Sequence, residues 1–220
     1  MPRESKRARA ARAREIARLL AGAYPGTAAE LCALRHDGPF QLLVATILSA
    51  QCTDERVNMV TPALFDRYPD APSLAGASRE ELEEMIRSTG FFRSKANHLL
   101  GMAAALADRF PDRFPTEMDE LTSLPGVGRK TANVVRSVAL GLPGLPVDTH
   151  VTRLARRLRL SEATSPEKIE ADLCAELPPE EWGAISLRLI LHGRSTCVAR
   201  SPRCGDCLLA PLCPSAGVGR

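Results

Sequence analysis

Leu124-Pro-Gly-Val-Gly-Arg-Lys-Thr-Ala132 has the form of a tight turn that leads into a helix. Proline presets φ at position 125, while Gly126 and Gly128 can adopt a positive φ or let another backbone approach closely. Backbone amides at the N-terminus of a helix point outward and bind phosphate readily. Lys130 follows one turn inside the expected helix. We therefore expect this turn to bind a phosphate group, with Lys130 close by.

Nearly the whole chain has a sequence typical of helices. No run of alternating β-branched residues bounded by turns is present, and 17 prolines separate a series of helical segments. Residues 118–137 are predicted to form a helix-hairpin-helix motif, whose first helix begins with a capping box of Thr116 and Asp119. The predicted fold class is therefore all-α. Other helices are expected at about 5–22, 40–50 and 91–110, after the caps Asp54, Ser78, Asp148 and Ser165, and at Pro179.

Composition and charge narrow the functional classes. At 220 residues, with 45% hydrophobic and 25% charged residues, the chain can form one large globular domain or two small ones. Its longest apolar stretch, around residues 40–50, is too short to span a bilayer, so no membrane role is expected. The net charge of +3 indicates a polyanionic partner only weakly. Basic residues gather in two segments that either contact a polyanionic partner or form solvated helix faces: Arg3, Lys6, Arg7, Arg9, Arg12 and Arg14, and Arg153, Arg156, Arg157 and Arg159.

The basic N-terminus has a second possible interpretation, an organelle transit peptide. Glu4 and Glu15 interrupt it, however, and the helical pattern of Ile16, Leu19 and Leu20 runs directly into the body of the chain. No apolar core of a secretory signal is found. The expected location is the cytoplasm.

The seven cysteines are unevenly placed. Three are scattered in helical patterns and are expected to be buried small hydrophobes, namely Cys32, Cys52 and Cys174. The other four follow the spacing C-x6-C-x2-C-x5-C: Cys197, Cys204, Cys207 and Cys213. An odd total and a local cluster of four predict a metal site and not disulfides. Structural zinc usually has two close ligand pairs, so an iron–sulfur cluster fits this spacing better, and zinc is the alternative.

Five features together resemble the endonuclease III family, bifunctional DNA glycosylases and abasic-site lyases of the helix-hairpin-helix superfamily. They are Leu48-Ser-Ala-Gln-Cys-Thr-Asp54, the hairpin from Leu124 to Ala132, Val147-Asp-Thr-His-Val151, Leu191-His-Gly-Arg194 and the four-cysteine spacing. Each motif alone is moderate evidence, but all of them in this order are highly specific. The similarity extends from about Glu15 to Cys213.

The resemblance implies two all-helical domains. A six-helix domain would span residues 33–143 and contain the helix-hairpin-helix motif at about 118–137. Residues 1–32 and 144–220 would form a second domain, which holds one 4Fe–4S cluster in the loop 197–213. DNA would lie in the cleft between the domains of a monomer. Residues 141–146, with two glycines and two prolines, are a linker candidate by sequence alone and fall at this boundary.

The resemblance also implies catalytic roles for two residues. Lys130 would displace the base, form a Schiff base with the sugar and cut the strand by β-elimination. Without the resemblance, a surface lysine that binds phosphate is the simpler interpretation. Asp148 would be the carboxylate that stabilises positive charge on the sugar or relays protons. From sequence alone it is equally well placed as the N-cap of the next helix.

Other implied site residues contact DNA or line the pocket. Gln51 would fill the space left by the flipped base, and Phe91 would be the complementary wedge. Pocket candidates are Ser49, Asp54 and His150. The hairpin residues expected to contact DNA are Leu124, Gly126, Val127, Gly128, Arg129 and Thr131. The expected metal ligands are Cys197, Cys204, Cys207 and Cys213.

Two departures from the family pattern lie near the predicted pocket. Phe91 and Phe92 stand where relatives often have an aliphatic residue and a tyrosine. Thr122 occupies a position where the family often has an acidic residue. Both departures bear on substrate range and on the preference for the base opposite the lesion.

The implied function is removal of oxidised pyrimidines such as thymine glycol from duplex DNA that contains a damaged base or an abasic site. One alternative is a sister glycosylase for mispaired bases, although those relatives generally lack the hairpin lysine. A second alternative is a non-catalytic DNA-binding module with a metal-stabilised tail. Such a module would need neither Lys130 nor Asp148.

Overall fold

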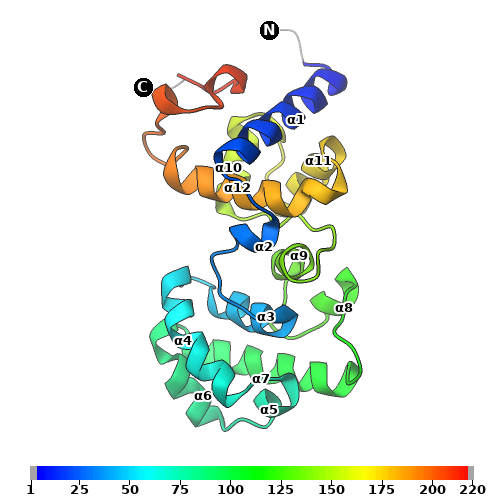
Figure 1. The fold of residues 1–220 in the computed structure, drawn as a ribbon, viewed down its shortest axis with the longest axis vertical. Coiled ribbons are helices and arrows are strands. Elements are labelled where there is room, and N and C mark those ends of the chain that lie inside the picture. Colours follow the sequence, from blue (N-terminus) through cyan, green and yellow to red (C-terminus); the bar gives the residue numbers. More distant parts are fainter. Residues whose placement is uncertain (1–3, 218–220) are drawn as a thin grey trace. The chain divides into compact units, whose positions relative to one another are not determined.

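The structure is a computed structural model that describes residues 4–217. Within this range every regular element is a helix and no strand is present (Figure 1), which confirms the predicted all-α class. No described helix is both long enough and apolar enough to cross a membrane. Residues 1–3 and 218–220, among them Arg3 of the basic N-terminus, lie outside the described residues.

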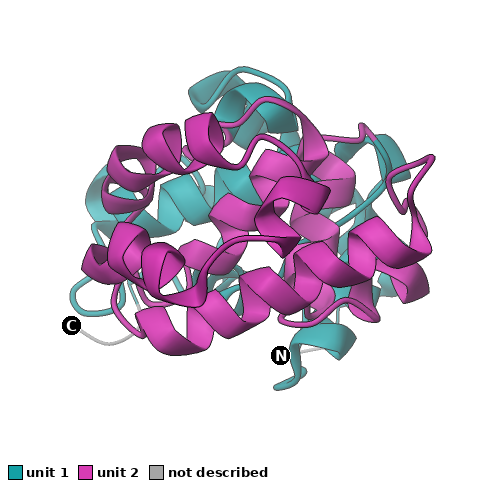
Figure 2. Cartoon of the chain, turned by 90° about the horizontal axis from the view of Figure 1, so that it is seen from below, with its two compact units in different colours: residues 1–31, 142–220 teal, residues 32–141 magenta. Residues whose placement is uncertain are grey.

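The chain divides into two compact units, residues 1–31 with 142–220 and residues 32–141 (Figure 2). The first unit contains α1 (Lys6–Ala23), α2 (Ala28–Leu31), α10 (Thr149–Arg157), α11 (Pro166–Glu176) and α12 (Trp182–Ser195), with 3-10 turns η2 (Pro179–Glu181), η3 (Cys204–Asp206) and η4 (Ala210–Leu212). The second contains α3 (Gly38–Leu48), α4 (Asp54–Arg67), α5 (Ala71–Ala75), α6 (Arg79–Ile86), η1 (Arg87–Thr89), α7 (Phe92–Arg109), α8 (Met118–Thr122) and α9 (Arg129–Val138).

The second unit is built around α3 and α7. Every residue of α3 from Leu42 to Leu48 is buried, as expected for a helix that is apolar on most sides. Leu99, Met102 and Leu106 form the buried stripe of α7, at the spacing of one helix face. Helix α7 packs against α5, α6 and α3.

The first unit joins the two ends of the sequence. Ile16 and Leu20 of α1 belong to the same buried core as Val151 and Leu154 of α10. The Arg12 guanidinium donates to the carbonyl oxygen of Leu158, at 2.5 Å, and thereby satisfies the end of α10. Part of the basic N-terminal segment is therefore structural and does not form a solvated face.

Several helices begin where the sequence predicts. The Ser78 hydroxyl accepts from the amide of Glu81 at 3.4 Å, and the Ser165 hydroxyl accepts from Lys168 at the same distance. Pro179 opens a 3-10 turn that continues into α12. Side chains within one turn of each helix start determine where the helix begins, which explains why these starts could be predicted.

Two predicted caps are wrong by one residue. Thr53, not Asp54, is the N-cap of α4, and its hydroxyl accepts from the Arg56 amide at 3.2 Å. The capping box of α8 consists of Glu117 and Glu120, not of Thr116 and Asp119. In both cases neighbouring side chains are chemically able to cap, and the fold selects one of the two positions.

Candidate functional site

The glycine turn connects α8 to α9 as predicted. Leu124 and Val127 are buried, and the Val127 amide donates to the carbonyl oxygen of Leu124 at 3.1 Å. Any contact that these two residues make with a ligand would therefore involve their backbone atoms. Gly126, Gly128 and Arg129 are exposed. The turn thus presents backbone on its outer side and anchors itself with two apolar side chains on its inner side.

Gly126 is required at its position for two reasons. Its φ is +75°, in the left-handed region that favours glycine. A Cβ atom there would lie 2.6 Å from the Cβ of His98 on α7, a distance that no real contact tolerates. On the same face of α7, a Cβ built on Gly101 would lie 3.2 Å from the Pro125 ring. Two glycines therefore let the turn pack directly on α7.

Gly126→Ala is expected to lower the free energy of unfolding by about 2 kcal/mol, because it combines backbone strain with a steric clash. Gly128→Ala is the matched control: its φ is −90°, and a Cβ atom at this position would meet nothing within 4 Å. Gly128→Ala should change the free energy of unfolding by less than about 0.5 kcal/mol. Urea denaturation of the unsubstituted protein and of the two variants measures both changes in the free energy of unfolding. Equal losses for the two variants would contradict this account of the turn.

Lys130 is the second residue of α9 and is exposed. The N-cap of this helix is Gly128, which has no side chain to accept hydrogen bonds from the first amides, and the first turn holds no acidic residue. Thr131, next along the helix, is half-buried. The beginning of α9 therefore offers an anionic ligand a lysine amine and amides that no N-cap side chain binds.

Asp148 is the N-cap of α10, as predicted. Its Oδ1 atom accepts from the Val151 amide at 2.8 Å, and the side chain is half-buried. An acidic side chain at this position interacts favourably with the positive end of the helix dipole. Lys130 belongs to one compact unit and Asp148 to the other.

His150 is held by a structural network. Its Nδ1 accepts from Arg153 Nη2 at 3.0 Å, since a guanidinium can only donate. The same Arg153 donates to the carbonyl oxygens of Gly193 and Cys197, at 2.9 and 3.1 Å. A Cβ on Gly193 would approach His150 Nδ1 to 3.0 Å, so glycine permits the close packing of α10 on α12. This histidine is therefore committed to an internal contact with Arg153.

Two exposed residues of the second unit have strained backbones. Gln51 has φ +53° and Phe91 has φ +47°, in a region that residues other than glycine rarely adopt. The Phe91 side chain is 66% exposed, although large apolar side chains are usually buried. These are the two residues for which insertion into DNA is predicted. Strain that persists in a native structure concentrates at functional sites.

The other pocket candidates of this unit lie next to Gln51. The hydroxyl of Ser49 donates to the carbonyl oxygen of Thr46 at 2.8 Å, so it closes the end of α3. Asp54 is half-buried in the first turn of α4. One turn thus brings Ser49, Gln51 and Asp54 together, whereas His150 belongs to the other unit.

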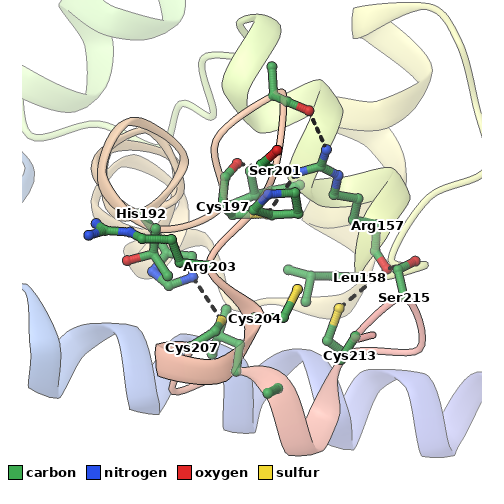
Figure 3. A pocket seen from close by; sticks show the side chains of 17 residues that line it. Arg157, Leu158, His192, Cys197, Ser201, Arg203, Cys204, Cys207, Cys213 and Ser215 are labelled. Carbon is green, nitrogen blue, oxygen red and sulfur yellow. Dashed lines mark hydrogen bonds between the residues drawn. The ribbon is translucent and has the colours of Figure 1, made fainter. Parts of the chain in front are cut away.

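The four C-terminal cysteines line a single cavity of about 240 Å³ (Figure 3). All four are free thiols, and burial raises the pKa of Cys207 and Cys213. Among residues 4–217, no group of three or more His, Cys, Asp and Glu side chains is arranged to hold a metal ion. The cavity therefore gathers the predicted ligands, without the tight convergence that a single ion requires.

Two residues that sequence reasoning did not assign to the cysteine cavity hold its sulfurs. Arg157 Nη1 donates to Cys197 Sγ at 3.3 Å and to the carbonyl oxygen of Val198 at 2.8 Å. His192 Nε2 lies 3.3 Å from Cys207 Sγ, and burial lowers the pKa of this histidine. For Arg157, the signal in the sequence was its spacing from Arg153, which places both side chains on one face of α10.

The basic residues at 153–159 are thus divided. Arg153 and Arg157 point into the protein, whereas Arg156 and Arg159 are exposed. Two of the four arginines, Arg153 and Arg157, therefore make internal contacts and do not form a solvated face. Arg153 binds the His150 ring and the carbonyl oxygens of Gly193 and Cys197, and Arg157 binds the cysteine loop at 197–199.

Comparison with known proteins identifies the family. Residues 44–179 match the model of the HhH-GPD superfamily of base excision DNA repair proteins. Endonuclease III of Synechocystis sp. is 55% identical over 206 residues, which is 93% of each chain. Two solved structures, a non-covalent endonuclease III–DNA complex and a trapped endonuclease III–DNA covalent intermediate, each match with 42% identity, a TM-score of 0.87 and coverage of 94% of this chain and 96% of theirs.

These matches confirm the resemblance inferred from the five sequence features, and with it the prediction of a base excision glycosylase and lyase. They exclude the alternative of a non-catalytic DNA-binding module. The chain belongs to the endonuclease III family within the HhH-GPD superfamily of base excision DNA repair proteins.

Proposed function

We propose that this enzyme removes oxidised pyrimidines such as thymine glycol from duplex DNA and then cleaves the resulting abasic site through Lys130. The observation that carries the proposal is the exposed lysine at the beginning of α9, directly after a turn that presents its backbone. We place the protein in the bacterial cytoplasm, as a monomer on nucleoid DNA. Residues 33–143 are proposed as the hairpin domain, and 1–32 with 144–220 as the cluster domain.

The covalent step belongs to Lys130. The unprotonated Nζ attacks C1′ of the damaged nucleotide, the glycosidic bond breaks, and the base leaves with the bonding electrons and takes up a proton. Opening of the sugar ring gives an imine between Nζ and C1′. Loss of a proton from C2′ then expels the 3′ phosphate, and water releases the enzyme. The solved relative described as a trapped covalent intermediate with DNA supports this assignment.

Asp148 is proposed to stabilise the positive charge that develops on the sugar when the base departs. Its carboxylate is fixed by the hydrogen bond from the Val151 amide, so it needs little reorganisation during the reaction. The capping role and the catalytic role are compatible, because one carboxylate oxygen binds the amide and the other remains for the substrate side.

The hairpin and the two strained turns are proposed to hold the DNA. The backbone amides at the beginning of α9 suit phosphate oxygens, a contact that carries no sequence information. Gln51 would occupy the space left by the extruded base, and Phe91 would unstack the bases on the opposite strand of the DNA duplex. Exposure of a phenylalanine in a left-handed conformation supports this role.

Oxidised pyrimidines are proposed over mispaired bases because the hairpin carries a lysine nucleophile. Thr122 does not supply the acidic group that relatives often have near the hairpin, and its hydroxyl donates to the Met118 carbonyl oxygen at 2.9 Å. Ser49 and His150 are likewise engaged within the protein. Asp54 stays a proposed pocket residue because it closely follows the turn that contains Gln51.

Borohydride trapping tests the proposal. The protein is incubated with duplexes that contain thymine glycol, an abasic site, or adenine opposite guanine, and borohydride is then added to reduce any imine. We expect a covalent complex with the first two duplexes and none with the third. Base release from the mismatch without a trapped complex would instead support the sister glycosylase.

The four cysteines are proposed to hold one 4Fe–4S cluster. Their donor set fits, since four free thiols line one cavity and the cationic Arg157 lies beside Cys197 to offset the negative charge of thiolates. When bound, the cluster would stiffen the loop 197–213. Arg157 and His192 would orient the sulfurs through the contacts described above.

The purified protein is expected to absorb visible light and to carry about four iron atoms per chain. Cys207→Ser should lose both properties, because it removes one of four thiolate ligands. Cys174→Ser, on α11 of the same unit, is the control that should retain them. A colourless protein with stoichiometric zinc would refute the iron–sulfur assignment in favour of the zinc alternative.

A further inference from the structure

Lys95 is a buried lysine that the reaction does not use. It lies in the first turn of α7, and only 3% of its surface is exposed. Its Nζ donates to two backbone carbonyl oxygens, that of Leu48 at 2.7 Å and that of Thr89 at 2.8 Å. One ammonium group therefore links two segments that are about forty residues apart in the sequence.

Both carbonyl groups precede the turns proposed to enter DNA. Leu48 ends α3 and is followed by the turn that contains Gln51. The amide of Cys52 donates to Ser49 and not to Leu48, so the carbonyl oxygen of Leu48 depends on Lys95 for its partner. Thr89 ends η1 and is followed by Gly90 and Phe91.

The backbone of Lys95 adds a third connection, because its amide donates to the carbonyl oxygen of Phe91 at 3.0 Å. Side chain and main chain of one residue thus fix the Phe91 turn at both ends. The side chain alone reaches the Gln51 turn. Lys95 can therefore hold the two turns at a fixed separation without a direct contact between them.

Burial of an ammonium group is costly, and burial indeed lowers the pKa of Lys95. A methionine would fill a similar volume without that cost. The position of the charge offsets part of the penalty, since both carbonyl groups lie at the ends of helices, where the helix dipole favours a cation. A lysine here is thus better suited to holding two helix ends than to filling a core.

We propose that Lys95 is a positioning residue that fixes the Gln51 and Phe91 turns relative to each other, so that both enter the DNA in one geometry. This inference rests on the proposed function of the two turns as insertion elements. Both strained residues follow the carbonyl groups that Lys95 binds, which explains how their left-handed backbones persist in the absence of DNA.

The first test uses the DNA-free protein and does not depend on the proposed function. Lys95→Met should increase hydrogen exchange of the amides at 50–52 and 90–92 by at least about tenfold, because both turns lose their shared partner. Leu106→Ala, a buried change near the other end of α7, is the control for general destabilisation. Its effect should not concentrate in the two turns. Unchanged exchange in a folded Lys95→Met protein would overturn the proposal.

The second test measures the consequence for DNA. Single-turnover excision of thymine glycol by Lys95→Met should be about 10- to 100-fold slower, as expected for displaced insertion residues. Cleavage of a preformed abasic site should fall less, because no base has to be extruded. In a protein that already carries Gln51→Ala and Phe91→Ala, adding Lys95→Met should change excision by less than about threefold. If Lys95→Met slowed excision by the same factor in this protein as it does alone, Lys95 would not act through the two turns.

A second variant covers the case that Lys95→Met does not fold. Lys95→Gln keeps an amide donor without the charge, and the same exchange and excision measurements apply to it. Faster exchange in both turns without a change in excision would refute insertion by Gln51 and Phe91 while the linking role of Lys95 stands. Slower excision with unchanged exchange would refute the linking role.

Discussion

Lys130→Ala should abolish borohydride trapping and strand cleavage and lower single-turnover base excision by more than about 10⁴-fold, because no other group replaces an active-site nucleophile. DNA binding should survive, since the backbone amides of the hairpin and the exposed arginines remain. Lys130 is exposed and makes no contribution to a buried core, so the melting temperature should also be unchanged. Gel analysis of reduced complexes measures trapping, and a binding titration at fixed salt measures DNA affinity separately.

The lysine content of the chain makes this experiment decisive. Only four lysines occur in all 220 residues: Lys6, Lys95, Lys130 and Lys168. Lys168 is exposed in the first turn of α11 and is the matched control, whose replacement by alanine should leave trapping intact. Trapping that persists in Lys130→Ala would transfer the role of nucleophile to one of the few remaining amines.

Asp148→Asn is expected to lower base excision by about 10²- to 10⁴-fold, the range typical of groups that assist charge or proton transfer. Asparagine keeps the geometry and caps a helix as well as aspartate does, so the free energy of unfolding should change little. Loss of excision activity in an Asp148→Asn protein of normal stability would show that catalysis needs the carboxylate charge, independently of the N-cap role. Excision kinetics and urea denaturation of the same preparation provide both values.

Asp148→Ala provides the comparison that isolates the cap. It should lose about 1 kcal/mol of stability beyond the asparagine variant, because the Val151 amide no longer has an acceptor. If the asparagine variant kept normal excision and only the alanine variant lost it, Asp148 would be a structural cap and the catalytic assignment would fail.

Local features of this chain were predictable from its sequence, and the reason is that neighbouring residues determine them. The glycine turn at Gly126, the cap at Asp148 and the grouping of four cysteines each depend on a few consecutive positions. The same holds for the helical series, since prolines and caps mark its boundaries. The one-residue errors at Thr53 and Glu117 arise where two adjacent side chains compete for the same role.

Residues that act across long stretches of sequence could not be predicted in this way. Lys95 binds a carbonyl oxygen 47 residues away, and Arg157 binds the cysteine loop 40 residues away. In the sequence both look like members of polar helix faces. Their roles follow from the packing of α7 against the end of α3 and from the contact of α10 with the loop at 197–199, which no local pattern specifies.

The joining of the two ends of the chain in one unit has a consequence for synthesis on the ribosome. Residues 32–141 are contiguous and can fold as soon as they emerge, whereas among the described residues the core that buries the apolar face of α1 is completed by residues 145–213. At about 5–20 residues per second, α1 waits on the order of ten seconds for those partners. During that interval Ile16 and Leu20 are exposed to water and available to chaperones. The unit proposed to hold the iron–sulfur cluster is thus the last part of the nascent protein to mature.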